Sequence, residues 1–95
     1  MNFAELTPSS IVARNEEILS TCLGEETVMM DIESGNYFGL GLIGSRIWQL
    51  IETPNSIQQI LDSLLAEYEV EKEQCLEDII DFLDQLAQNR IVLTK

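Results

Sequence analysis

The sequence contains no histidine, which removes the side chain that most often serves as a general base or a metal ligand. Its two cysteines, Cys22 and Cys75, lie far apart and form no CxxC pair, so no zinc site is indicated. Without a histidine to raise the thiolate fraction, neither cysteine is a good candidate nucleophile, and both are interpreted as small buried apolar residues. We therefore expect no catalytic residue, no metal and no cofactor.

Basic residues are also scarce, because 5 lysines and arginines stand against 17 acids and give a net charge of −12. Nucleic acid is an unfavourable partner for such a chain, since phosphate binding depends on basic side chains. The sequence has no apolar run that could span a bilayer, and its start has neither the basic residues nor the apolar core of a secretory signal. We expect no membrane partner and a cytoplasmic location with reduced thiols.

A chain of 95 residues, 45% hydrophobic, has enough apolar surface for one modest core but not for a core and a deep enzyme cleft. We expect a single domain over residues 1–95, with allowance for flexibility in residues 1–10. The composition thus favours a binding module over an enzyme.

Residues 34–45 carry no charge and hold four of the five glycines. Within this run, residues 37–40 have the character of a short strand and lack the proline or lysine that usually protects an exposed sheet edge. An unprotected edge can accept an extended peptide as an additional strand. This segment is therefore predicted to form half of a peptide-binding site.

The first part of the chain predicts an antiparallel sheet of three strands. Residues 11–14 and 18–23 are short and moderately apolar, consistent with a first strand without fixed bounds. Residues 27–32 predict the second strand, with Val28, Met30 and Ile32 on one face and Met29 on the other. Glu33-Ser34-Gly35-Asn36 then has turn chemistry, so residues 37–40 should pair back as a hairpin.

Three helices should follow. Apolar residues at helical spacing indicate the first from Ile43 to Ile51, ended by Thr53-Pro54. A capping box at Ser56–Gln59 begins the second, and the third runs from about residue 71 to 89, before an apolar tail at 91–93. The order predicts an α+β, winged-helix-like domain with an N-terminal three-stranded antiparallel sheet followed by three helices. The acids on the exposed face of the third helix argue against DNA binding.

The apolar stripe of the third helix is wider than one core contact requires. Cys75, Ile79, Phe82 and Leu86 extend it on one side and are predicted to form the wall of a groove that another chain fills. The alternative is that the first strand or the C-terminal tail covers them. The many acids in and before this helix either steer a basic partner or only favour solubility.

Three segments carry a resemblance to the PqqD-like proteins, also called RiPP recognition elements: the hairpin of residues 29–40, the run Gly44-Ser45-Arg46-Ile47-Trp48-Gln49-Leu50-Ile51, and residues 78–86. The resemblance implies a domain that binds the leader segment of a ribosomally made precursor peptide. It also implies that the leader pairs with the third strand and packs against the third helix. One departure is Gly41, where many relatives have asparagine.

Carried onto this sequence, the resemblance assigns main-chain pairing to the third strand and side-chain contacts to the third helix, with Asp78 available to a leader lysine or arginine. The expected peptide-binding residues are Met29, Tyr37, Phe38, Gly39, Leu40, Cys75, Asp78, Ile79, Phe82 and Leu86.

The resemblance is greatest to the stand-alone leader-binding proteins of lasso peptide biosynthesis, which implies a separate leader peptidase and a macrocyclase as partners. A peptide chaperone for a radical SAM enzyme is an alternative. A remote one is an acyl carrier protein, since Asp62-Ser63-Leu64 matches the attachment motif with Ser63 as the modified residue. The free sheet edge is also able to pair two copies of the chain.

Overall fold

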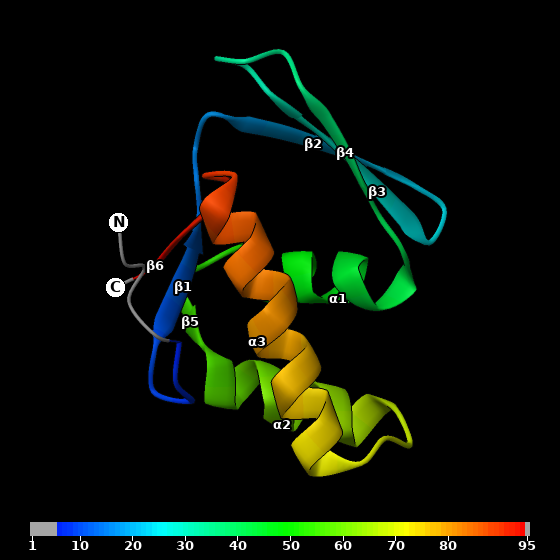
Figure 1. Cartoon of the computed structure of the whole chain (residues 1–95). Helices are drawn as coiled ribbons and strands as arrows, with labels where there is room; N and C mark the ends of the chain where they lie inside the picture. Colours follow the sequence, from blue (N-terminus) through cyan, green and yellow to red (C-terminus); the bar gives the residue numbers. More distant parts are fainter. Residues whose placement is uncertain (1–5, 95) are drawn as a thin grey trace.

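The computed structural model of the chain describes residues 6–94. It has three helices and six strands in two antiparallel sheets, an α+β fold as predicted (Figure 1). The expected flexibility of residues 1–10 falls in part on residues 1–5, which lie outside the described residues. Further along, the carbonyl oxygens of Pro8 and Ser10 accept hydrogen bonds from Gln58 N and Ile57 N, at 2.9 and 3.0 Å.

The first sheet contains β2 (Ile18–Leu23), β3 (Glu26–Asp31) and β4 (Tyr37–Leu40), in the order β2-β3-β4. All neighbours are antiparallel, and β4 lies at an edge, as the sequence predicts. Gly24 occupies the β2–β3 turn with φ 69°, a conformation that residues with a Cβ adopt rarely.

The turn between β3 and β4 ends in a β-bulge. Gly35 N and Asn36 O both bond to the backbone of Asp31, at 2.7 and 2.9 Å, so two residues of one strand oppose one residue of the other. Gly35 takes φ 76°, which glycine tolerates at no steric cost. The predicted hairpin is confirmed, with Gly35 at the position that requires a positive φ.

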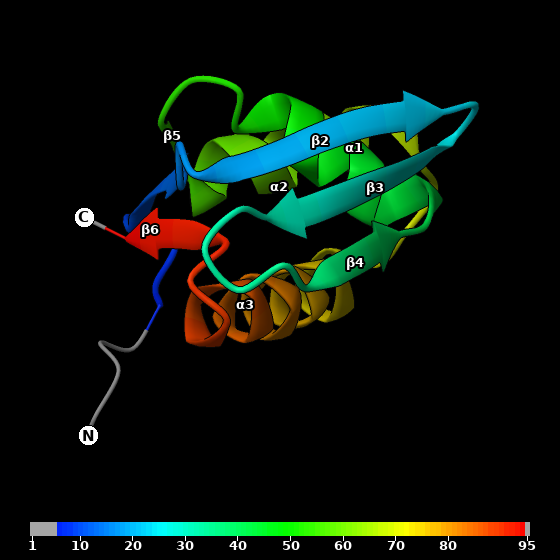
Figure 2. The same ribbon diagram turned by 90° about the horizontal axis from the view of Figure 1, so that it is seen from above.

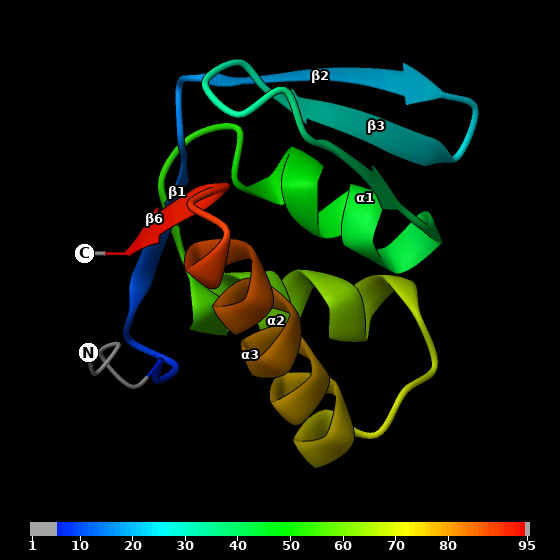
Figure 3. The same ribbon diagram turned by 45° about the horizontal axis from the view of Figure 1, so that its top comes forward.

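The two faces of this sheet have different surroundings. Thr27 and Met29 of β3 are buried and stand opposite Leu40 and Phe38 of β4, all directed toward the helices. The alternate residues of the three strands point to the other side, which Figure 2 views from above. In the part of the chain that the structure describes, helices cover one face of this sheet only (Figure 3).

The second sheet was not predicted. It contains β5 (Asn55–Ser56), β1 (Ile11–Arg14) and β6 (Val92–Thr94), in the order β5-β1-β6. The segments 11–14 and 18–23, expected to share one first strand, are separated by a turn and enter different sheets. Strands this short show no clear period in the sequence, and β1 pairs with β6 from the other end of the chain.

The helices agree closely with the prediction: α1 spans Leu42–Leu50, α2 Ile57–Glu67 and α3 Lys72–Gln88. The capping box is present, because Gln59 N donates to Ser56 Oγ at 3.1 Å and Gln59 Oε1 accepts from Ser56 N at 3.4 Å. This reciprocal pair satisfies two amides at the start of α2. Among residues 6–94, no helix is long and apolar enough to cross a membrane.

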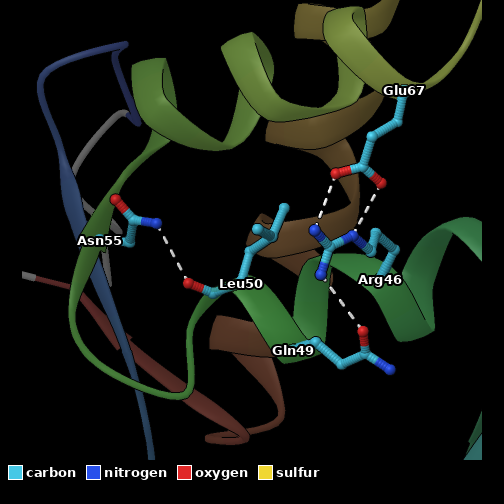
Figure 4. Close-up of polar contacts among 5 residues, drawn as sticks. All are labelled: Arg46, Gln49, Leu50, Asn55 and Glu67. Atoms are coloured by element: carbon cyan, nitrogen blue, oxygen red, sulfur yellow. Dashed lines mark hydrogen bonds and ion pairs between the residues drawn. The ribbon is translucent and has the colours of Figure 1, made fainter.

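Helix α1 lies directly beneath the first sheet (Figure 3). Trp48 Nε1 donates to Ser20 Oγ of β2 at 3.1 Å, and the Arg14 guanidinium of β1 lies 4.3 Å from the Trp48 ring centroid. On the other side, Arg46 Nε and Nη2 bond both oxygens of Glu67 at 2.8 and 2.7 Å, tying α1 to α2 (Figure 4). Helix α1 is thus fastened to both sheets and to α2.

The core fills the space between the sheets and the helices. Cys75 is buried there, as expected, but Cys22 is exposed near the end of β2, so its interpretation as a buried residue is wrong. A strand at the edge of a sheet packs fewer of its residues than a helix between two layers. The fully buried side chains include Val12, Met29, Ile51, Ile57, Ile60, Leu61, Ile79, Leu83 and Ile91.

Candidate functional site

A groove of about 660 Å³ separates β4 from α3. Seen from above, α3 lies on the same side of the molecule as β4, whereas β2 lies on the opposite side (Figure 2). The lining residues come from the end of β4, the first turns of α1, the α2–α3 connection and one face of α3. They are Gly39, Leu40, Gly41, Leu42, Ile43, Gly44, Ile47, Leu64, Val70, Glu71, Gln74, Cys75, Asp78, Ile79 and Phe82.

The floor and rim of the groove are mainly apolar. Leu42, Ile43 and Val70 are exposed large hydrophobic residues, although the chain is strongly charged elsewhere. A cluster of exposed apolar side chains around a hollow is typical of a binding site.

Gly44 determines where the groove wall lies. A Cβ on Gly44 would come within 3.1 Å of Phe82 Cζ and 3.2 Å of Cε1. The absence of a side chain at Gly44 therefore allows the half-buried Phe82 ring to rest on the first turn of α1.

The outer edge of β4 has backbone groups free for pairing. Asp31 and Asn36 form a hydrogen-bonded pair, and bonded and non-bonded pairs alternate along an antiparallel ladder. Phe38 and Leu40 therefore turn their backbone groups toward β3, whereas Tyr37 and Gly39 turn theirs away from it. Among residues 6–94, no strand pairs with this side of β4.

The charged residues of the lining are both acidic. Asp78 lies on α3, where its Oδ1 accepts a hydrogen bond from Gln74 Nε2 at 2.9 Å, and Glu71 lies at the N-cap of the same helix. Within residues 6–94, no lysine or arginine lines the groove to neutralise them. The site therefore favours a ligand that is apolar with a basic group at one end.

Cys75 offers no reactive thiol to the groove. Burial, and in addition the nearby Asp78 carboxylate, raise the pKa of the Cys75 thiol above its ordinary value of 9.0. The thiol is then protonated at neutral pH, and a protonated thiol is a poor nucleophile. Among the described residues, no group of three or more His, Cys, Asp or Glu is arranged to hold a metal ion.

The junction between β4 and α1 differs from a side-chain-capped helix start. Gly41 is the N-cap and supplies no side chain, whereas the Ser45 hydroxyl, buried inside α1, donates to Leu40 O at 3.1 Å. Ser45 N also bonds Gly41 O at 2.8 Å. Ser45 thus fixes the angle between the strand edge and the groove floor.

The groove brings together six of the residues expected from the sequence: Gly39, Leu40, Cys75, Asp78, Ile79 and Phe82. Tyr37 lies at the far end of β4, 72% exposed and on the opposite face of the sheet. Phe38 packs against the core, Met29 is fully buried at 0% exposure, and Leu86 is buried at 7%, so none of these three lines the groove.

The contributions of α1 and of the α2–α3 connection to the groove were not predicted from the sequence. Leu42, Ile43 and Gly44 fall within the charge-free run of residues 34–45, and this run was the available signal. Val70 follows Glu69 and precedes Glu71, so its neighbours in sequence gave no indication of a groove.

Residues 26–92 match the family model described as coenzyme PQQ synthesis protein D (PqqD). The chain belongs to the PqqD family. A comparison with curated protein sequences gives no match. The family match includes β4, α1 and α3, and therefore every element that forms the groove.

Two solved structures are similar to this PqqD family member. TbiB1 in complex with the TbiA(beta) leader peptide is 34% identical, with a TM-score of 0.80 over 84% of this chain and 93% of the other. A lasso peptide synthetase B1 complexed with the leader peptide is 27% identical, with a TM-score of 0.78 over 86% of this chain and 96% of the other.

Proposed function

We propose that this chain binds the leader segment of a ribosomally synthesised precursor peptide, without catalysing a reaction, and delivers it to a separate leader peptidase and a macrocyclase for lasso peptide maturation. The whole chain acts as one domain in the cytoplasm. The observation that carries the proposal is the position of the free β4 edge beside the apolar groove of α3.

The leader adds to β4 as a fourth strand of the first sheet. The N–H and C=O groups of Tyr37 and Gly39 bond its backbone, because these are the groups that point away from β3. Backbone pairing supplies affinity with little demand on sequence. Phe38 and Leu40 support the strand from the core side.

Side chains of the leader provide the selectivity. In an added strand, alternate side chains point toward the helices, where the groove presents Ile43, Ile79 and Phe82 to an apolar group. Asp78 and Glu71 pair with a lysine or arginine of the leader. Among the sequence-predicted residues, Met29 and Leu86 act through the core that positions β4 and α3.

Both similar structures contain a leader peptide, and their chains are matched almost over their full length. This supports leader binding and favours lasso peptide maturation over the alternative, a chaperone for a radical SAM enzyme. The carrier alternative has less support, because Ser63 is half-buried inside α2 and carrier serines stand at a helix start.

The test is a titration of the protein with the synthetic leader of the precursor peptide encoded beside it, followed by amide NMR shifts. A scrambled peptide of the same composition is the control. We expect saturable binding that shifts residues 37–44 and 75–82, and no saturation with the scrambled peptide. Absence of binding, or shifts elsewhere, would contradict the proposal.

Two further measurements distinguish the alternatives. An intact mass after incubation with a phosphopantetheinyl transferase should be unchanged, whereas a mass increase at Ser63 would support the carrier function. Sedimentation of the free protein shows whether the β4 edge pairs two copies, and the leader should dissociate such a dimer because both occupy the same backbone groups.

A further inference from the structure

The outer face of the first sheet, directed away from the helices, is mostly apolar, with Thr21 and Glu26 among its polar residues. Along each strand, alternate residues reach this face, and they include Leu19 and Leu23 of β2, Val28 and Met30 of β3, and Tyr37 of β4. The register places Leu19 opposite Met30 and Met30 opposite Tyr37, so one apolar row crosses all three strands. Figure 2 looks onto this face.

Three of these side chains are exposed to solvent, and Val28 and Met30 are half-buried. Leu19 is 54% exposed and Tyr37 72%, and Leu23 and Ile32 are likewise exposed. The surface is also hollowed, with a depression of about 220 Å³ lined in part by Leu19, Met30 and Tyr37. A contiguous exposed apolar patch on a small protein usually marks an interaction site.

The charges around this face argue against a second copy of the chain. Residues 15–45, which form the whole first sheet, hold six carboxylates and no lysine or arginine. Two copies placed face to face would bring together two sheets that, with their turns, carry six carboxylates each, without a basic residue from either sheet. The complementary surface is an apolar one flanked by lysine and arginine, which belongs to a different protein.

The face is continuous with the leader site. A leader strand added to β4 directs its other alternate side chains onto this same face, beside Tyr37 and Gly39. Gly39 has no side chain, and a Cβ there would meet nothing within 4 Å. No side chain of Gly39 therefore stands between the added strand and a protein bound to this face. A protein seated on the face would therefore touch the sheet and the leader together.

We infer that the outer face of the β2-β3-β4 sheet docks a leader-processing enzyme, through an apolar contact centred on Leu19, Met30 and Tyr37 and flanked by basic residues of the enzyme. The identity of the partner as a processing enzyme rests on the proposed function. The enzyme binds the leader-loaded protein more tightly than the free protein, because the leader completes the contact surface.

Leu19→Glu tests the inference, since Leu19 is exposed, lies on β2 and is remote from the groove. Leu93→Glu is the matched control: Leu93 is 49% exposed but lies on β6 of the other sheet. Each variant is titrated with the leader and, loaded with leader, with the purified leader peptidase encoded beside the precursor.

We expect Leu19→Glu to weaken association with the leader peptidase by about tenfold or more, as for a residue central to an interface. Its leader affinity should match that of the natural protein, and Leu93→Glu should change neither. Removal of the leader should weaken association of the natural protein.

The inference is overturned if Leu19→Glu associates with the peptidase like the natural protein, or if the peptidase does not bind the natural chain. It is also overturned if the chain forms a dimer that Leu19→Glu dissociates, because a second copy then occupies the face. Failure of the proposed function is seen separately, because the natural protein would then not bind the leader in its own titration.

Discussion

The Phe82 ring rests on Gly44, and a methyl group at this position would fit only if the ring moved by a few tenths of an ångström. A Cβ at Gly44 would lie 3.1 Å from Phe82 Cζ, closer than most real contacts of that kind. This contact joins α3 to the start of α1, and it places the aromatic wall of the groove beside the end of β4. The width of the groove thus depends on one glycine.

Gly44→Ala should reduce leader affinity, with a loss of stability that the higher helix propensity of alanine partly offsets. The added methyl displaces the Phe82 ring, an overpacking that costs about 1–3 kcal/mol, while alanine is favoured over glycine in a helix by up to about 1 kcal/mol. We expect roughly fivefold weaker leader binding, measured by titration beside thermal unfolding. The double variant with Phe82→Leu, which lacks the clashing atoms, should show a smaller effect of the alanine; equal effects in both backgrounds would exclude the contact as the cause.

Replacement of Phe82 by glutamate should abolish leader binding and leave the domain folded. The ring is half-buried and lines the groove, so a carboxylate there repels an apolar ligand without entering the core. Circular dichroism reports the fold and titration reports binding. Phe82→Leu is the control and should still bind. An unfolded Phe82→Glu protein would mean that Phe82 serves the core.

Gly39→Pro should also abolish binding without unfolding the protein. The N–H of Gly39 points away from β3, so proline removes a bond to the leader and none to the sheet. Gly39→Ala retains this N–H and has open space for its methyl group, so it should bind normally. Phe38→Pro, which removes an N–H directed at β3, should instead lower the unfolding temperature. If instead Gly39→Pro unfolded the protein and Phe38→Pro only abolished binding, the N–H of Gly39 would point toward β3 and that of Phe38 away from it.

Leader association should slow as salt is added. Glu71 and Asp78 are the charged residues of the groove and attract a basic leader group, an attraction that salt screens. Stopped-flow rates at several ionic strengths measure the slope, and Asp78→Asn should reduce it. If the association rate of the natural protein does not depend on ionic strength, the acidic residues of α3 do not attract the leader and serve only solubility.

The bond between Arg46 and Glu67 should make stability sensitive to acid. The hydrogen bonds from Arg46 lower the pKa of Glu67 below its ordinary value of 4.5. Since the folded-state pKa is the lower one, this stabilisation is present above about pH 4.5 and is lost as the pH falls through the folded-state pKa. The difference in unfolding temperature between the natural protein and Glu67→Gln should therefore shrink below pH 4.5; a difference that stays constant would exclude the ion pair as its source.

Local chemistry made several elements predictable from the sequence. Ser56 and Gln59 form the capping box that begins α2, and Gly35 occupies the bulge that returns β4 to β3. The exposed edge of β4 and the groove residues Cys75, Ile79 and Phe82 were also predicted. An uncharged strand and a widened apolar stripe are both patterns that can be recognised within a short stretch of sequence.

The tertiary structure alone decided the second sheet, the floor of the groove and the inward direction of Met29 and Leu86. β1 pairs with β5 and β6, which lie far along the chain, and no local signal records such pairing. A two-residue period separates the faces of a strand but does not say which face is buried. That choice came from the helices packed beneath the sheet, which turned Met29 into the core and left Leu19, Met30 and Tyr37 outside.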